Sequence, residues 1–507
     1  MLPQGLSEDQ ASAQGSALPP AAAAALTFGA SAAVLVLELT ALRLIAPYVG
    51  LTLETSTAVI GAALSAIALG AWAGGATADR TSPRRVIGPL LLVSGALTLI
   101  VNPAVRWMAE VGNPTTAAVN SLLFAAVTVF VPAAVLSAIP PMVVKLQLAT
   151  LSETGSVVGR LSAISTLGAI AATFVTGFVL ILLFPVSIIL LGTGVALIGA
   201  GLVVVLTAGR KQGPHALSVA GPVAVAIFAG AVGVVAPNPC DQETRYHCVS
   251  VITDSGRTDG RTLRLDNAQH SYVALNDPKY LDFDYVRAMA GVLDAASPGR
   301  TPLDVLHVGG GAMTLPRYQL VSRDGGLNTV IEIDPGIIQV DRQRLGLPTS
   351  RRLDIRAADA RTEVRRLADD SYDAYVGDAF SGVAVPWHLT TRETVADVDR
   401  VLRPDGVFTQ NIIDFEGLRF LAAGVATVGA VFDHVAVYEQ TTKTDGGGNF
   451  VVIASQRPLD RVAIKAAVAK HEAPMRLMPD SHVQRWRESA LVLTDDYAPV
   501  DQLISRE

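Results

Sequence analysis

Seven apolar stretches, each long enough to span a membrane as a helix, fill most of the first 236 residues of this 507-residue chain. About 20 consecutive apolar residues are needed to cross the hydrocarbon core of a bilayer. The stretches lie near residues 24–46, 56–78, 86–106, 116–142, 163–184, 187–207 and 216–236. We therefore predict a multi-pass α-helical membrane domain over residues 21–236, in contact with the lipid bilayer. Residues 1–20 are polar and contain no Lys or Arg, which predicts a disordered tail and not a signal peptide.

The positive charges indicate how the predicted helices cross the membrane. Cytoplasmic loops of membrane proteins carry an excess of Lys and Arg. The loops after spans two, four and six contain Arg80, Arg84, Arg85, Lys145, Arg160, Arg210 and Lys211, whereas the opposite side has at most Arg43 and Arg106. We therefore predict a cell-membrane protein with a cytoplasmic N-terminus and, after seven crossings, an extracytoplasmic C-terminal domain.

Polar residues inside the membrane domain admit two interpretations. Glu38 lies within the first span, where a carboxylate is costly and usually faces a partner or a polar cavity. Arg43 is a candidate partner, so a structural ion pair and a substrate site both remain open. The segment Gly74–Arg85 resembles the loop between spans two and three of major-facilitator transporters, and a basic cytoplasmic turn without any transport is the alternative.

The second half of the chain has the composition of a globular domain. Residues 237–507 contain 30 Lys and Arg against 38 Asp and Glu, a net charge of −8. This acidic balance argues against nucleic acid and is compatible with a cationic ligand. The chain's only cysteines, Cys240 and Cys248, lie just after the last predicted span. They are too few for a metal site and form either two buried thiols or a disulfide, which the predicted extracytoplasmic location favours.

Strands and helices alternate in this half, as in an α/β domain. Short strands over 245–274 predict a small β module within residues 237–280, and a helix is predicted near 282–294. Further strands are predicted at 303–308, 328–333, 353–357, 372–377 and 407–413, with helices at 312–322, 335–345, 361–368 and 391–402. This order is typical of βαβ units and a mainly parallel, Rossmann-like sheet, assigned to residues 281–460 and followed by a C-terminal extension over 461–507.

A glycine turn and several acids stand where the predicted parallel strands end. The turn Gly309–Gly311 allows a close backbone approach to a ligand, and Glu332 at the next strand tip is placed to accept ribose hydroxyls of a nucleotide-like cofactor. The third glycine of the dinucleotide fingerprint is missing, which disfavours NAD. Asp359 is placed to accept a hydrogen bond from an exocyclic amine such as adenine N6. Alternatively, Asp359 and Asp378 cap the helices that follow them.

Several segments reproduce, in order and spacing, the motifs of one enzyme family. They are Glu243-Thr-Arg-Tyr-His247, Leu265-Asp-Asn-Ala-Gln269, Tyr285, Gly309-Gly-Gly311, Glu332-Ile-Asp334-Pro335, Asp359-Ala360, Tyr372–Asp378, Leu402–Gly406 and Gly446–Val451. Through these motifs, residues 243–455 resemble the spermidine synthase (polyamine aminopropyltransferase) family. The whole chain resembles the membrane-fused form of that family, which carries a transporter-like domain.

The resemblance implies an enzyme that transfers an aminopropyl group to a small cationic amine. Decarboxylated S-adenosylmethionine would be the co-substrate, with Glu332 on its ribose and Asp359 on its adenine, and Asp378 would be the base that accepts a proton from the attacking amine. The other residues implied in the donor site are Gly309, Gly310, Gly311, Asp334, Tyr285 and Gln269. No metal is implied, and a homodimer is compatible with the resemblance.

The chain departs from the family at three positions. Ala312 stands where the family has an acid near the donor's amine, Ser381 replaces a second active-site acid, and Val286 replaces a glutamine. Two of the carboxylates that would recognise a diamine are therefore absent. These departures leave two alternatives: methyl transfer from S-adenosylmethionine on the same fold, and a non-catalytic module that binds a polyamine or nucleoside for the transporter-like half.

Overall fold

The computed structural model describes residues 18–49, 53–111, 117–148, 154–212, 240–266, 268–380, 385–441 and 447–504, with five further positions between 224 and 232. The chain divides into two compact units, Met1–Pro239 and Cys240–Glu507. Each unit has its own buried core, and the two are described separately below.

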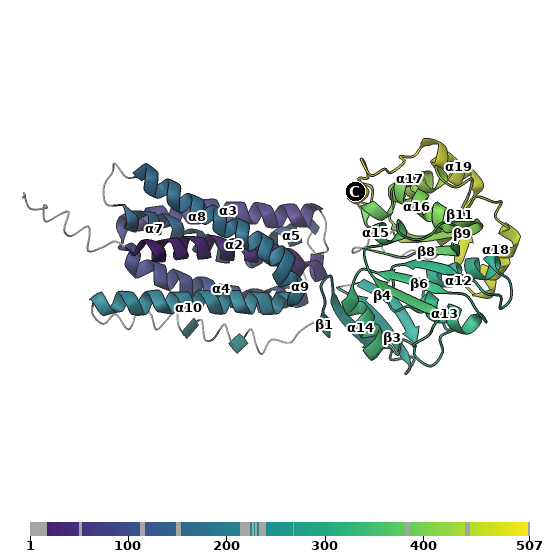
Figure 1. Ribbon diagram of the computed structural model, residues 1–507, viewed down its shortest axis with the longest axis horizontal. Helices are drawn as coiled ribbons and strands as arrows, with labels where there is room; N and C mark the ends of the chain where they lie inside the picture. The colour runs from purple at the N-terminus through teal and green to yellow at the C-terminus, as the bar shows by residue number, and fades with distance from the viewer. Residues whose placement is uncertain are drawn as a thin grey trace, which may run out of the picture. The chain divides into compact units, whose positions relative to one another are not determined.

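The N-terminal unit is a helical bundle (Figure 1). Its helices are α2 (Pro20–Val49), α3 (Leu53–Arg80), α4 (Pro83–Val111), α5 (Ala117–Ala125), α6 (Val131–Ser137), α7 (Ile139–Gln147), α8 (Thr154–Val175), α9 (Ile181–Leu183) and α10 (Val186–Gln212), with π-helical turns η1 (Ala126–Phe130) and η3 (Thr176–Leu180). Small residues allow the helices to approach closely: a Cβ at Gly70 would lie 2.2 Å from the Ala134 carbonyl oxygen of α6.

Six segments of this bundle are long and apolar enough to cross a membrane, within the part of the chain that the structure describes. They are Pro20–Val49, Leu53–Arg80, Pro83–Ala109, Val119–Gln147, Thr154–Leu183 and Val186–Thr207. These segments match the first six predicted spans and confirm a multi-pass membrane domain. The predicted seventh span, near residues 216–236, lies outside the described residues except for isolated positions. The predicted orientation of the termini, which depends on that span, stays a prediction.

The C-terminal unit begins with a four-stranded antiparallel sheet. Its strands, in spatial order, are β1 (Gln242–Glu243), β2 (Cys248–Thr253), β3 (Gly260–Leu265) and β4 (Ala268–Ala274). Cys240 and Cys248 form a disulfide at its start. Of the two alternatives left open by the sequence, the structure contains the disulfide.

The larger sheet has eight strands in the order β12-β10-β11-β9-β8-β5-β6-β7. Its strands are β5 (Val305–Val308), β6 (Asn328–Glu332), β7 (Leu353–Ala357), β8 (Tyr372–Gly377), β9 (Leu402–Asp414), β10 (His434–Gln440), β11 (Gly448–Ser455) and β12 (Met475–Leu477). The strands from β9 to β7 pair in parallel, and β11, β10 and β12 add antiparallel pairs at one side. This is the predicted Rossmann-like, mainly parallel sheet.

Helices cover both faces of this sheet, as its strands require. The helices are α12 (Asp284–Ala296), α13 (Thr314–Ser322), α14 (Pro335–Arg344), α15 (Ala360–Val364), α16 (Arg392–Val401), α17 (Arg419–Gly429), α18 (Arg461–Lys470), α19 (Asp480–Ser489) and α20 (Val500–Leu503). Successive strand residues enter different cores: Val305 packs in the cluster of α12, α13 and α18, and Leu306 in the cluster of α15, α16 and α17. Strands with a nearly continuous run of apolar residues are typical of a sheet that is buried on both faces.

The last 47 residues are part of the domain and not an appendage. β12 pairs with β10 at the sheet edge, and α18 packs against α12. Leu493 is fully buried in the core that contains α17. The residues that the sequence analysis set apart as an extension therefore complete the sheet and cover one of its cores.

Candidate active site

A cavity of about 130 Å³ opens at the carboxyl ends of β5, β6 and β8. Parallel strands bring their carboxyl ends to one edge of the sheet, and α/β proteins bind ligands there. The cavity lining includes Gly309 after β5, Glu332 at the end of β6, Asp359 after β7, and Asp378 after β8. Tyr285 of α12 joins them. With Gly311, which also lines it, six of the site residues predicted from the sequence lie around one cavity.

The glycine turn after β5 has no room for side chains. Gly309 has φ +91°, and a Cβ there would lie 2.3 Å from the Asp378 carbonyl oxygen. Gly311 has φ +48°, and its Cβ would lie 2.3 Å from Ser271 Oγ of β4. Glycine is the residue that adopts these conformations at no steric cost. The turn thus packs directly against Asp378 and Ser271, which both line the cavity.

Glu332 is held by the backbone on both of its oxygens. Its Oε2 accepts from the Gly310 N–H at 2.7 Å, and its Oε1 accepts from the Asp334 N–H at 2.9 Å. Burial raises the pKa of Glu332 above its ordinary value, and the two backbone donors oppose that rise. A carboxylate has about four acceptor positions on its two oxygens. The fixed side chain therefore keeps acceptor capacity for hydroxyl groups in the cavity.

Asp334 and Asp359 each cap a helix. Asp334 is fully buried, its Oδ1 accepts from the Gly336 N–H at 2.9 Å, and its other oxygen accepts from the Thr244 hydroxyl. It does not line the cavity, so its carboxylate fixes the start of α14 beside Glu332. Asp359 Oδ1 accepts from the Thr362 N–H at 2.9 Å, while its Oδ2 lies 3.7 Å from His388 Nε2 at the cavity. Asp359 thus combines the capping role with exposure to the cavity.

Asp378 lies at the centre of a three-residue hydrogen-bond network. The Tyr285 hydroxyl donates to its Oδ2 at 3.1 Å, and Asn411 Nδ2 of β9 donates to its Oδ1 at 3.0 Å. Burial raises the pKa of Asp378 to about 6, although both hydrogen bonds lower it in part. Burial also raises the pKa of Tyr285 well above its ordinary value, which keeps its hydroxyl a donor. A carboxylate with this pKa is suited to accept a proton near neutral pH.

A second, adjoining cavity shares Tyr285, Gly309 and Asp378 with the first. It also exposes Asp282, whose Oδ1 accepts from the Tyr280 hydroxyl at 3.1 Å. Among the described residues that line the two cavities, four are Asp or Glu and none is Lys or Arg. The two cavities therefore meet at Asp378 in an environment suited to a cationic ligand and not to an anionic one.

Of the predicted site residues, Gln269 and Asp334 line neither cavity, and Gly310 lines only the second. Gln269 of β4 is exposed and lines neither cavity, whereas its neighbours His270 and Ser271 line the first one. Ala312, where the related family has an acid, is fully buried. Ser381 lies outside the described residues.

Several polar residues of the site were missed from the sequence. Among them are Asn411, the lining residues Asp282 and Ser271, and three histidines, His247, His270 and His388. His247 Nδ1 lies 3.0 Å from Asp266 Oδ2; burial lowers the pKa of His247, but Asp266 outweighs that effect and raises it overall. Burial lowers the pKa of His270 to about 4, so this ring is neutral at physiological pH. Asn411 lies in β9 directly after the polar residues Thr409 and Gln410, so its sequence context did not single it out.

Relatives of two kinds match the C-terminal unit, and no family model matches the chain. A polyamine aminopropyltransferase of Vibrio vulnificus is 26% identical over 240 residues, which are 44% of this chain and 77% of that protein. Spermidine synthase homologues therefore cover the C-terminal unit. Together with the six apolar helices of the N-terminal unit, this fits the predicted membrane-fused form.

Methyltransferases are among the matches as well. An N-terminal histidine N-methyltransferase of Emericella nidulans is 29% identical over 181 residues, 35% of this chain and 32% of that protein. The crystal structure of a probable spermidine synthase from Corynebacterium glutamicum is 27% identical, with a TM-score of 0.47, and the match covers 51% of this chain and 97% of that one. The relatives thus divide between aminopropyl and methyl transfer.

Proposed function

We propose that the C-terminal domain transfers an aminopropyl group from decarboxylated S-adenosylmethionine to a small cationic amine, most simply a polyamine. The observation that carries the proposal is Asp378, fixed by Tyr285 and Asn411 at the junction of the two cavities, with its pKa raised by burial to about 6. In the proposed reaction the amine nitrogen attacks the carbon next to the sulfonium. The carbon–sulfur bond breaks, the thioether nucleoside leaves, and Asp378 takes the proton lost by the amine.

The charge of the site supports the decarboxylated donor. An intact S-adenosylmethionine carries a carboxylate, which would meet Asp282 and Asp378 with no Lys or Arg among the described lining residues. Like charges in a recessed site repel, whereas the ammonium group of the decarboxylated donor is attracted. In this arrangement Glu332 accepts the ribose hydroxyls and Asp359 faces the adenine amine. Asp282 is the acid available for an amine in the second cavity, whereas Ala312, at the position of the related family's acid, is buried and lines neither cavity.

Methyl transfer from S-adenosylmethionine is the second candidate. Ala312 favours it, because this position lacks the acid that would hold the donor's amine in the related aminopropyltransferases. The similarity to a methyltransferase agrees with that alternative. Both candidates use an S-adenosylmethionine-type co-substrate in the same cavity.

Product analysis separates the candidates. The purified full-length protein is incubated with each sulfonium donor and a series of diamines, and nucleoside products are identified by mass spectrometry. Aminopropyl transfer releases 5′-methylthioadenosine and elongates the amine by an aminopropyl unit. Release of S-adenosylhomocysteine would instead establish methyl transfer. Donor binding without either product would contradict both activities and leave a non-catalytic binding module.

A further inference from the structure

The cavity wall that faces Asp359 is a short segment outside both sheets. This wall is defined as Pro386 together with the 3₁₀ helix η4 (Trp387–Leu389). Pro386, His388 and Leu389 line the cavity, and His388 Nε2 lies 3.7 Å from Asp359 Oδ2. Inside the wall, the Leu389 N–H donates to the Pro386 carbonyl at 2.8 Å. One short turn does not fix its own position, so the placement of the wall depends on contacts with other elements.

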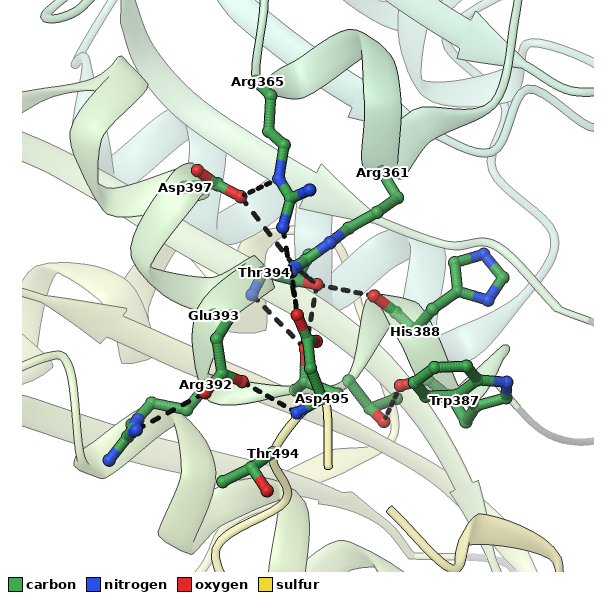
Figure 2. Close-up of polar contacts among 12 residues, drawn as sticks. Arg361, Arg365, Trp387, His388, Arg392, Glu393, Thr394, Asp397, Thr494 and Asp495 are labelled. Carbon is green, nitrogen blue, oxygen red and sulfur yellow. Dashed lines mark hydrogen bonds and ion pairs between the residues drawn. The ribbon is translucent and has the colours of Figure 1, made fainter. Parts of the chain in front are cut away.

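Two side chains connect the wall to the helix that follows Asp359. The Thr394 hydroxyl of α16 donates to the His388 carbonyl at 2.5 Å and accepts a hydrogen bond from the Arg361 guanidinium. Arg361 is a buried residue of α15, two positions after Asp359. Figure 2 shows Arg361 and Thr394 meeting beside His388. Arg361 therefore joins the wall to α15, the helix that follows Asp359, at the end of the cavity lined by Asp359 and His388.

Arg361 has two acidic partners: Asp397 of α16, whose Oδ2 lies 3.8 Å from Arg361 Nη1, and a residue near the end of the chain. Arg361 Nη2 donates to Asp495 Oδ2 at 2.6 Å (Figure 2). The Thr391 hydroxyl, at the cap of α16, donates to Asp495 Oδ1 at 2.7 Å. The Asp495 N–H in turn donates to Glu393 Oε2 at 3.0 Å. Asp495 thus joins elements that precede it by 134 and 104 residues.

The backbone around Asp495 is docked in the same place. The Leu493 carbonyl accepts from the Arg392 N–H at 2.8 Å, and the Leu493 N–H donates to the Thr427 hydroxyl at 2.8 Å. The Asp495 side chain is 41% exposed, so its charge attraction to Arg361 is screened by solvent. Asp495 therefore acts mainly by orienting the Arg361 guanidinium and the Thr391 hydroxyl, which hold the wall.

We propose that Asp495 is a positioning residue for the end of the donor cavity at Asp359. It holds Arg361 and Thr391 so that the wall stays fixed against Asp359. The inference rests on the proposed function, in which the adenine of the donor lies at this end. Asp378 follows β8 and Tyr285 lies in α12, and neither residue contacts Asp495. Loss of Asp495 therefore weakens nucleoside binding and leaves the chemical step in place.

Asp495→Asn tests the proposal, with Asp496→Asn as the matched control. Asp496 is exposed, and within the described residues it makes no polar contact. Binding of 5′-methylthioadenosine to the full-length protein is measured by titration calorimetry. A hydrogen bond to a charged group contributes about tenfold or more to an affinity, so we expect about tenfold weaker binding for Asp495→Asn, in which Asp359 is misplaced relative to the wall, and wild-type binding for Asp496→Asn. Equal affinity of both variants and the wild type overturns the proposal.

Hydrogen exchange gives a second readout that needs no ligand. The amides of Leu389 and Thr390, both bonded within the wall, should exchange faster in Asp495→Asn than in Asp496→Asn. A second pair isolates the Thr391 hydroxyl: Thr391→Val should reproduce the loss, and Thr391→Ser should restore wild-type behaviour. If the wild type binds no 5′-methylthioadenosine, the proposed function is wrong, and the exchange rates decide on Asp495 alone. Unchanged exchange in Asp495→Asn and Thr391→Val rejects its positioning role.

Discussion

Asp378→Asn should abolish most turnover while leaving donor binding intact. Asparagine keeps the size and one acceptor of the side chain but cannot take a proton from the attacking amine. A general base commonly contributes about 10²–10⁴-fold, and we expect a loss of kcat in that range. The nucleoside is held by other residues, with Glu332 bonded to the Gly310 and Asp334 backbone, so the donor should still bind, and loss of the Asp378 charge should weaken that binding far less than it lowers kcat.

The pH dependence of wild-type turnover tests the role of Asp378 as the base independently of any substitution. With a pKa of about 6, Asp378 is roughly 90% carboxylate at pH 7 and roughly 10% at pH 5. The value of kcat/KM, whose pH dependence reports the pKa values of the free enzyme, should therefore fall about tenfold between these pH values, because a protonated Asp378 cannot act as the base. Asp405→Asn, at an exposed position of β9, is the control for the loss of one negative charge. An Asp378→Asn variant with wild-type turnover, or a flat wild-type profile from pH 5 to 7, would refute the assignment of the base.

Three further predictions address the neighbours of Asp378 and the side of the membrane. Tyr285→Phe removes a hydrogen bond that lowers the pKa of Asp378, so the inflection in kcat/KM should move above pH 6; an inflection at lower pH contradicts the network. Glu332→Ala should weaken donor binding about tenfold or more in calorimetry, since it removes the acceptor of the ribose hydroxyls, and unchanged affinity would place the nucleoside elsewhere. We also propose that the C-terminal domain is extracytoplasmic: a membrane-impermeant thiol reagent should label Cys240 and Cys248 on intact cells only after reduction, and labelling confined to lysed cells would place the domain in the cytosol.

The parts of the site predicted from the sequence are those fixed by local rules. Glu332, Asp359 and Asp378 each follow a strand, and parallel pairing gathers them at one edge of the sheet. The glycine turn after β5 is likewise a property of adjacent residues. These features require only the alternation of strands and helices, which is strong in this half of the chain.

Not every residue of the site could be predicted from the sequence. Gln269 was assigned to the donor site through the family resemblance, but it is exposed, and its neighbours His270 and Ser271 line the cavity instead. Asn411 reaches Asp378 from a strand 33 residues later, and Asp495 reaches Arg361 across 134 residues. No pattern within one short stretch of sequence predicts contacts between residues so far apart in the chain.

Head-to-head titration of the two sulfonium donors tests the central claim most directly. The wild-type protein in detergent is titrated by calorimetry with decarboxylated S-adenosylmethionine and with S-adenosylmethionine under the same conditions. The cavity lining, with Asp282 and Asp378 and no described Lys or Arg, predicts at least about tenfold tighter binding of the decarboxylated donor. Equal binding, or tighter binding of S-adenosylmethionine, would contradict aminopropyl transfer and assign the site to the methyl donor.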